Sequence, residues 1–300
     1  MNISVIVPTY NRPDNLKECL DNLKRQNLDR KFFEIIVVDD GSSMELEPLV
    51  NLSLRDSGIK YFFIKQVNSG PAEARNKGIL AATGEVILFI GDDIMASNNY
   101  LYEHYNFHLK NNGSDMAMLG FTTWSKDIKI SDFMIWLEAS GFQFGYNDLK
   151  PGQAAGYNYF YTSNISLKRR FMLDNGLSNS SFRYAAFEDS ELGYRLIRAG
   201  LKLIYNPQAL AYHKHEVNFK GSMERMKIVG ESAKIFSGLH PELADELSLK
   251  SWRGLKGKIK NAVVCIFYFL GGLLNNQRLK GYFWKSKMLN SYIKGYDGVK

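Results

Sequence analysis

Short apolar runs alternate with amphipathic segments along the first hundred residues, and this alternation restricts the fold more than any other feature. The runs at 3–7, 32–38, 61–64 and 85–90 are rich in Ile, Val, Leu and Phe, as expected for strands covered on both faces. Between the first two runs, apolar side chains recur at the spacing of one helix face: Leu16, Cys19, Leu20 and Leu23. This order predicts an α/β fold with a mixed, mostly parallel sheet flanked by helices.

The two cysteines limit the chemistry and suggest the compartment. Cys19 and Cys265 lie far apart in the chain, so one copy cannot build a disulfide framework or a cysteine-rich zinc site. The chain opens directly on an apolar run, without the basic leader and cleavage site of a signal peptide. We therefore expect a cytoplasmic protein.

Polar side chains gather where the predicted strands end. Clusters stand at 8–11, 39–42, 68–78 and 91–93, and the carboxyl ends of parallel strands meet at one edge of a sheet. We expect the four clusters to form one site there. No strand is followed by the glycine-rich turn of dinucleotide-binding enzymes or by the phosphate loop of NTPases, which disfavours both classes.

The segments VIVPTYNR, VVDDGS, NSGPAEARNKG, LFIGDDI and FEDSELGYRL, in this order, resemble the motifs of family 2 glycosyltransferases. The resemblance covers about residues 1–215 and implies a GT-A nucleotide-sugar glycosyltransferase domain with a Rossmann-like sheet. It further implies an inverting transfer of a sugar from a nucleotide diphosphate donor, with Mn²⁺ or Mg²⁺ as the cofactor.

An adjacent pair of acids, Asp92 and Asp93, follows the strand predicted at 85–90. Two neighbouring carboxylates raise each other's pKa unless a cation neutralises them, and hard divalent ions suit such oxygen ligands. The resemblance implies that Asp93 binds the metal, that Asp92 lies near the ribose, and that His213 completes the metal site. The family often has an acid where this chain has Gly91, which puts the ribose contact in question.

The resemblance also assigns the donor pocket. It implies that an acid after the second strand accepts the N3–H of uracil, with Asp40 favoured over Asp39, and that Arg75 binds the diphosphate, although local sequence equally allows a surface ion pair. The complete set of expected donor-binding residues is Pro8, Thr9, Tyr10, Asp39, Asp40, Arg75, Asp92 and Asn164.

The catalytic base implied by the resemblance is Asp189, in the segment FEDSELGYRL. This segment is predicted to begin a helix, and a helix N-terminus lowers the pKa of a carboxyl group and weakens it as a base. We expect removal of water by the bound acceptor to compensate. The alternative is that Asp189 caps the helix.

The basic charge is concentrated at the C-terminal end. The whole chain carries +7, whereas residues 250–300 hold eleven basic side chains and one acid. Within this part, the uncharged run 262–274 is shorter than the roughly 20 residues that a membrane-spanning helix needs. We expect residues 216–300 to form a helical extension that lies on an anionic membrane surface, packs on the catalytic domain, or joins two copies.

The expected function is transfer of a sugar, from UDP by preference, to a glycan or lipid-linked acceptor in surface polysaccharide or glycoconjugate synthesis at the inner face of the membrane. A catalytically silent scaffold with the same fold is the alternative. A nucleotidyltransferase is disfavoured because no glycine-rich basic loop follows the first strand. Nucleic acid is not expected as a partner, because that role does not require the apolar run in the tail.

Overall fold

The computed structural model describes residues 1–253 and 277–299, and it divides into two compact units. The first unit consists of residues 1–130 and 138–216. The second consists of residues 131–137 and the described part of 217–300. Residues 131–137, which the sequence analysis placed in the first domain, therefore belong to the second unit.

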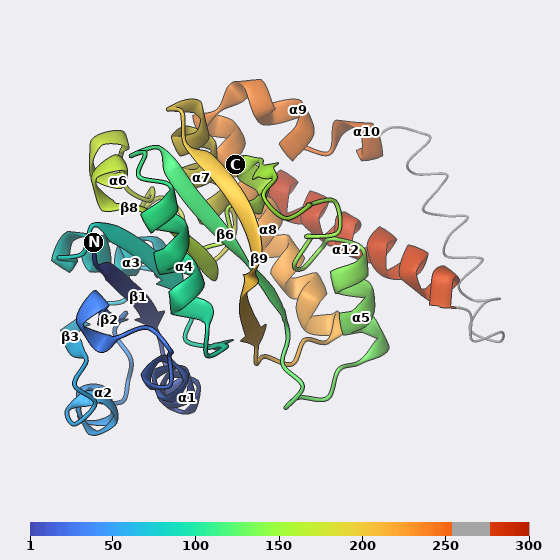
Figure 1. Ribbon diagram of the computed structural model, residues 1–300. Helices are drawn as coiled ribbons and strands as arrows, with labels where there is room; N and C mark the ends of the chain where they lie inside the picture. Colours follow the sequence, from blue (N-terminus) through green and yellow to red (C-terminus); the bar gives the residue numbers. More distant parts are fainter. Residues whose placement is uncertain (254–276, 300) are drawn as a thin grey trace. The chain divides into compact units, whose positions relative to one another are not determined.

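A nine-stranded mixed sheet, in the order β3-β2-β1-β4-β8-β6-β9-β5 with β7 paired to β9, forms the centre of the first unit (Figure 1). Strands β1, β2, β3 and β4 are parallel, as are β6 and β9, whereas β8 runs antiparallel between β4 and β6. The strands are β1 (Ile3–Thr9), β2 (Phe33–Asp39), β3 (Lys60–Lys65), β4 (Val86–Ile90), β5 (Ile94–Ala96), β6 (Met116–Trp124), β7 (Ala154–Ala155), β8 (Asn164–Lys168) and β9 (Lys202–His213). The expected α/β class is confirmed.

Helices cover both faces of the parallel strands. The buried stripes of α1, α2 and α4 pack with alternate side chains of β1, β2 and β4 in one core, while Ile6 of β1 faces α3 on the other side, where a Cβ on Gly78 would lie 2.5 Å from Ile6. The helices of this unit are α1 (Pro13–Lys24), α2 (Glu47–Leu54), α3 (Pro71–Ala81), α4 (Tyr100–Lys110), α6 (Arg169–Asn175) and α7 (Glu188–Arg198), with short 3₁₀ turns η1 (Arg30–Phe32) and η2 (Tyr157–Tyr159).

The sequence predicts two strands in the middle of the chain, over 159–167 and over 201–205, and the structure differs at both. The first, β8, begins only at Asn164, because the backbone N–H groups of Tyr161 and Asn164 close turns before it. The second, β9, continues past Asn206 to His213. The β6–β9 register shifts between Leu119 and Phe121, and an irregularity of this kind accommodates Pro207, which has no N–H to donate.

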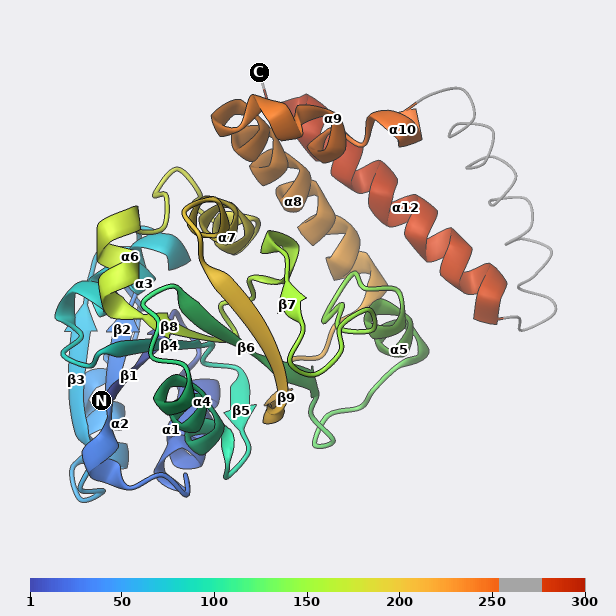
Figure 2. The ribbon, with the colours of Figure 1, turned by 45° about the horizontal axis from the view of Figure 1, so that its top comes forward.

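In the second unit, two long helices, α8 (Phe219–Leu239) and α12 (Gln277–Gly298), lie side by side in both views (Figures 1 and 2). They run in the same direction, since Phe219 contacts Phe283 and Ser237 bonds Tyr296. The unit also contains the start of α5 (Asp132–Ala139), η3 (Pro241–Leu243), α9 (Ala244–Leu247) and α10 (Lys250–Arg253). The apolar run 262–274 lies outside the described residues.

None of the described helices combines the length and the hydropathy needed to span a lipid bilayer.

Candidate active site

The carboxyl ends of β1, β2 and β4 place the predicted polar clusters together. Thr9 and Asp39 are register partners at the ends of β1 and β2, and the Thr9 hydroxyl donates to Asp92 Oδ2 at 2.8 Å. The backbone N–H of Asp40 donates to the Thr9 carbonyl at 2.9 Å. The polar groups that follow these three strands therefore form one cluster at a single edge of the sheet.

Asp92 and Asp93 share a cation that the sequence analysis did not single out. The Arg12 Nη1 atom lies 3.3 Å from Asp92 Oδ1 and 2.8 Å from Asp93 Oδ2. Burial, and then the charge of Asp93, raises the pKa of Asp92 to about 6. Burial also opposes ionisation of Asp93, but His213 and Arg12 outweigh it and hold the pKa of that carboxyl well below its usual range. Because two adjacent carboxylates require a nearby cation, the sequence could have indicated a basic partner such as Arg12.

The side chain of His213 is directed at Asp93 by aromatic neighbours. Its Nε2 atom lies 3.3 Å from Asp93 Oδ2, and its ring stacks on Trp124 at 5.5 Å and meets the edge of Phe144 at 5.3 Å. His213 is the last residue of β9, and His215 lies beyond the end of the strand. Packing on two rings holds the imidazole in one orientation.

Gly91, at the position where the resemblance would place an acid, stands directly beside the Asp93 carboxylate. A Cβ atom at this position would lie 2.9 Å from Asp93 Oδ1 and 3.2 Å from Ile94, closer than ordinary van der Waals contact. A side chain at residue 91 would therefore require the Asp93 carboxylate to shift by a few tenths of an ångström.

A divalent cation fits the oxygen-rich group formed by Asp93 and its neighbours. Within the described residues no group of three or more His, Cys, Asp or Glu side chains has metal-binding geometry. Mg²⁺ and similar ions commonly bind one or two carboxylates and take their other ligands from substrate phosphates and water. The donor set of Asp93 and His213 is consistent with that mode.

The two acids after β2, Asp39 and Asp40, differ in their hydrogen-bond partners, and the difference does not favour Asp40 as the acceptor for uracil. Asp40 accepts hydrogen bonds from Gln66 Nε2 at 2.6 Å, Ser69 N at 2.8 Å and Gly70 N at 2.9 Å. Asp39 accepts one bond, from Ser42 N to Oδ1, while its buried Oδ2 has no partner among the described residues. Asp40 is thus engaged in holding the loop before α3. Asp39, rather than Asp40, therefore retains a carboxylate oxygen that can accept a further hydrogen bond.

Arg75 forms a buried ion pair instead of a surface one. Its Nη1 donates to Glu188 Oε1 at 2.9 Å, and the two side chains are only 10% and 4% exposed. The pair joins α3 to the first residue of α7. The structure therefore favours a positioning role for Arg75 over the expected contact with diphosphate, and it adds Glu188 as a site residue that sequence reasoning missed.

Asp189 is the second residue of α7 and is half-buried. It accepts a hydrogen bond from Ser190 N at 2.8 Å and another from the backbone of Thr162. Burial, and then the charge of Glu188, raises the pKa of Asp189 to about 7. The protein itself supplies the desolvation that the sequence analysis assigned to a bound acceptor. The helix N-cap is Phe187, not Asp189.

Asn164 does not face this cluster. It is fully buried in β8, and its Nδ2 donates to the carbonyls of Phe121 at 3.1 Å and Ala209 at 2.9 Å. Its Oδ1 lies 3.0 Å from His104 Nε2. These bonds join β8 to the irregular part of β6 and β9. The structure argues against the expected role of Asn164 in donor binding.

Pro8 is half-buried and Tyr10 is 47% exposed at the end of β1, beside the cluster.

Among the aromatic side chains between residues 121 and 161, Trp124, Phe144 and Tyr146 are buried, and the rings of Trp124 and Phe144 meet edge to face. From sequence alone, such rings could either stack on sugar faces or form part of the core. Burial assigns these three to the core.

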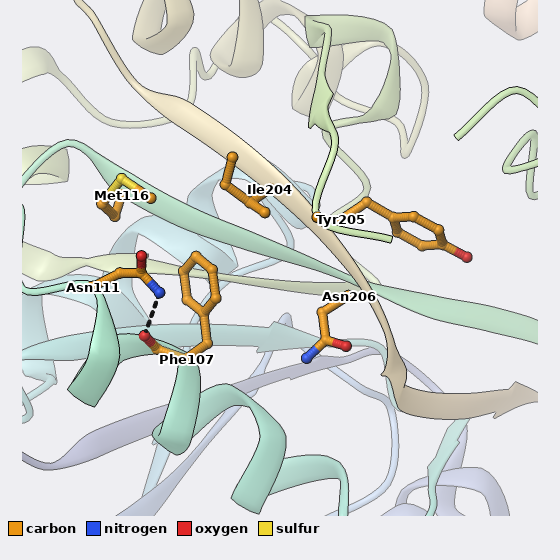
Figure 3. A pocket seen from close by; sticks show the side chains of 7 residues that line it. Phe107, Asn111, Met116, Ile204, Tyr205 and Asn206 are labelled. Atoms are coloured by element: carbon orange, nitrogen blue, oxygen red, sulfur yellow. Dashed lines mark hydrogen bonds between the residues drawn. The ribbon is translucent and has the colours of Figure 1, made fainter. Parts of the chain in front are cut away.

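A separate hollow of about 390 Å³ lies against β6 and β9 (Figure 3). Its lining includes Phe107, Met116, Ile204 and Asn206, and the amide of Asn111 donates to the Phe107 carbonyl there. Met116 begins β6, whereas Trp124 and His213 pair at the far ends of β6 and β9. The hollow is therefore distinct from the polar cluster, which carries the acids and the histidine.

Solved structures confirm the GT-A fold. The chain aligns with the mannosyltransferase PcManGT of Pyrobaculum calidifontis in complex with GDP-Man and Mn²⁺, at a TM-score of 0.70 and 16% identity over 98% of this chain and 86% of that one. It also aligns with S. aureus TarS 1–349 in complex with UDP, at a TM-score of 0.58 and 17% identity over 99% and 91% of the two chains. At these identities the likeness concerns the fold.

Sequence comparison supports the same grouping. A poly(ribitol-phosphate) beta-glucosyltransferase of Bacillus spizizenii is 37% identical over 119 residues, which cover 39% of this chain and 19% of that protein. The chain spans about a fifth of the length of several curated relatives that it matches. The family described as glycosyl transferase family 2 matches residues 4–176, more than half of the chain. The sheet, the acids at its edge and this match together show that the chain belongs to glycosyl transferase family 2.

Proposed function

We propose that this protein is an inverting, metal-dependent transferase that moves a sugar from a nucleoside diphosphate to a glycan or lipid-linked acceptor in surface polysaccharide or glycoconjugate synthesis. The observation that carries the proposal is the pairing of Asp93 with His213 at one sheet edge, together with a half-buried Asp189 whose pKa is raised. UDP is the favoured nucleotide. The complexes named above contain UDP in one case and GDP-Man with Mn²⁺ in the other.

The nucleobase is selected by Asp39 in this proposal. A buried carboxylate oxygen without a partner accepts a ring N–H, which uracil carries at N3 and guanine at N1, whereas cytosine has no such hydrogen. Thr9, Tyr10 and Pro8 line the same strand end. The site is therefore suited to UDP or GDP and unsuited to CDP.

The acceptor is activated by Asp189. A carboxyl group whose pKa is about 7 is well matched to take a proton near neutral pH. As the acceptor oxygen bonds to the anomeric carbon, its proton passes to Asp189 and the bond from that carbon to the diphosphate breaks, leaving the electron pair on the diphosphate. One displacement of this kind inverts the anomeric configuration.

The leaving group is the diphosphate, and Asp93 and His213 would hold a divalent cation that offsets its charge. Ser190 and Thr162 keep the Asp189 carboxylate in place through their backbone N–H groups. Arg75 and Glu188 tie the start of α7 to α3, and so determine where Asp189 lies relative to the strand ends.

The donor site is tested by calorimetric titration of UDP, GDP, CDP and ADP with Mn²⁺ and then with excess chelator. We expect UDP binding that requires the metal and that falls at least about tenfold in Asp93→Ala, since a charged ligand is lost. Asp29→Asn, an exposed acid paired with Lys31, is the matched control. Absence of diphosphate binding in every metal would contradict the transferase and favour the scaffold.

Base selection is tested with Asp39→Asn. The amide presents N–H toward the uracil N3–H, so we expect UDP affinity to fall by about tenfold to a hundredfold, in line with roughly 1–3 kcal/mol for an unmade buried hydrogen bond. CDP affinity is expected to rise, because cytosine N3 accepts from the amide. Equal losses for UDP and CDP would show that Asp39 acts on the loop and not on the base.

We also propose a cytoplasmic location, with the basic C-terminal part on the inner face of the membrane. The support is the charge distribution along the sequence.

A further inference from the structure

Arg12 combines an anchored backbone with a partly exposed side chain. It is the N-cap residue of α1, and Asn11 before it has a positive φ of 53°. Ser42 Oγ accepts from Asn11 N at 2.8 Å, and Ser43 N donates to Asn11 Oδ1 at 2.9 Å. The loop is therefore anchored to the turn after β2. The Arg12 side chain is 44% exposed, so its guanidinium can move without disturbing the core.

The guanidinium lies on the carboxylates that the proposed metal needs. A single nitrogen, Nη1, contacts both Asp92 and Asp93, and the Oδ2 of Asp93 that it contacts is also the atom nearest His213 Nε2. A divalent ion bound to this oxygen would stand beside the guanidinium, and like charges at such distances repel strongly in a partly buried site. Arg12 and the metal therefore compete for the same atoms.

We propose that Arg12 is an internal counter-cation of the nucleotide-free protein, which neutralises Asp92 and Asp93 and is displaced when a metal and a diphosphate arrive together. This inference rests on the metal-dependent function proposed above. Metal alone meets the competing guanidinium and binds weakly. A diphosphate offers Arg12 a better partner, because guanidinium groups pair bidentately with phosphate oxygens.

The position of Arg12 favours this exchange. It stands at the first turn of α1, and the free backbone N–H groups and dipole of a helix N-terminus attract phosphate. Displaced from the acids, the side chain remains beside the groups to which a diphosphate binds. Metal and nucleotide binding are then cooperative, since each removes Arg12 from the other's path.

The test measures Mn²⁺ binding at pH 8 from the paramagnetic resonance signal of the free ion, with and without UDP. The proteins are the full-length wild type, Arg12→Gln, Arg12→Lys, and the control Arg25→Gln, which removes an exposed positive charge from the C-terminal end of α1. Without UDP we expect Arg12→Gln to bind Mn²⁺ at least tenfold more tightly than the wild type, and Arg25→Gln to match the wild type. With UDP this advantage disappears or reverses.

Thermal unfolding gives a second readout. Without metal, Arg12→Gln is expected to melt below the wild type, because two carboxylates lose their cation, and Mn²⁺ is expected to raise its melting temperature more than that of the wild type. Arg12→Lys keeps the charge and is expected to behave as the wild type does. A variant that simply fails to fold would show no recovery with Mn²⁺.

Two results would overturn the inference while leaving the proposed function intact: Mn²⁺ affinity of Arg12→Gln equal to or below the wild type without UDP, or an equal gain in Arg12→Lys. Failure of every protein to bind Mn²⁺, with UDP present as well as absent, would instead remove the proposed function and this inference with it.

Discussion

At the scale of single residues, neighbouring acids of the same type have different roles because their surroundings differ. Asp40 is saturated by loop donors, whereas Asp39 keeps a buried free oxygen. Asp92 has a raised pKa and Asp93 a lowered one, although they are adjacent in sequence. The sequence identifies each pair, and the tertiary contacts decide between its two members.

The proposed role of Asp189 as the catalytic base predicts how turnover depends on pH. A base must be deprotonated, and burial raises the pKa of Asp189 to about 7, so kcat/KM is expected to rise with pH through that value and then level off. Asp189→Asn is expected to lose about 10²–10⁴-fold in kcat, the usual contribution of general base catalysis. Rates measured between pH 5 and 9 with the donor found by calorimetry check both.

The variant Glu188→Gln tests whether the charge of Glu188 helps to raise the pKa of Asp189. It removes the negative charge that helps to raise the pKa of Asp189, so the midpoint of the pH profile is expected to move to lower pH. A flat profile in the wild type, or a midpoint unmoved in Glu188→Gln, would show that another group limits the rate.

At the scale of elements, glycines allow α8 and α12 to approach closely. A Cβ on Gly230 would overlap the Tyr292 carbonyl, and one on Gly295 would overlap the Lys227 carbonyl. The crossing is thus built from backbone against backbone, and Ser237 and Tyr296 add a 2.9 Å hydrogen bond further along it. Glycines within a helix are costly for its intrinsic stability, so their presence here indicates a packing requirement.

Replacing Gly230 by Ala is expected to destabilise the second unit. The added methyl group meets a backbone carbonyl that cannot rotate away, and overpacking of this kind costs about 1–3 kcal/mol. Gly238→Ala, on the same helix with open space at its Cβ position, is the control and is expected to gain up to about 1 kcal/mol from helix propensity. Urea unfolding followed by circular dichroism measures both, and equal stability of the two variants would contradict the close crossing.

Other elements show where local patterns stop being informative. The apolar runs predict β1, β2 and β4 well because strands buried on both faces need continuous apolar sequence. The course of β9 past Pro207 was missed because a register shift against β6, which no local pattern records, makes room for the proline. The start of α5 was likewise not predicted, because it lies in an aromatic stretch without helical periodicity. Its apolar side chains pack on residues distant in sequence, such as Trp284.

At the scale of the whole molecule, the dominant feature is the uneven charge. The first 249 residues are slightly acidic, whereas the last 51 carry a net charge of +10. Exposed basic side chains of α12, among them Arg278, Lys285 and Lys294, contribute to this excess. Such a distribution favours contact with an anionic surface.

The full-length protein is therefore expected to bind vesicles that contain phosphatidylglycerol and to release them as salt rises from about 50 to 300 mM. Each basic residue near an anionic surface contributes about 1 kcal/mol, so Lys285→Glu combined with Lys294→Glu is expected to weaken binding at least about tenfold. Lys110→Glu, an exposed lysine of the first unit, is the control. Vesicle cosedimentation measures the three proteins.

Equal binding to neutral phosphatidylcholine vesicles, or no binding at all, would contradict a membrane role for this part. Light scattering on the same samples would then distinguish a helical extension that packs within one copy from one that joins two copies.

The sequence by itself determined the α/β class, the edge of the sheet where the polar clusters meet, and the family, because apolar runs and the turn residues after them are local signals. Only the tertiary structure decided which side chains contact one another at the site. Arg12 meets Asp92 across 80 residues and Arg75 meets Glu188 across 113, while Asn164 is turned into the core. Such contacts depend on strand register and on which helix faces pack together, so the chemistry of each acid is determined by neighbours that are distant in the chain.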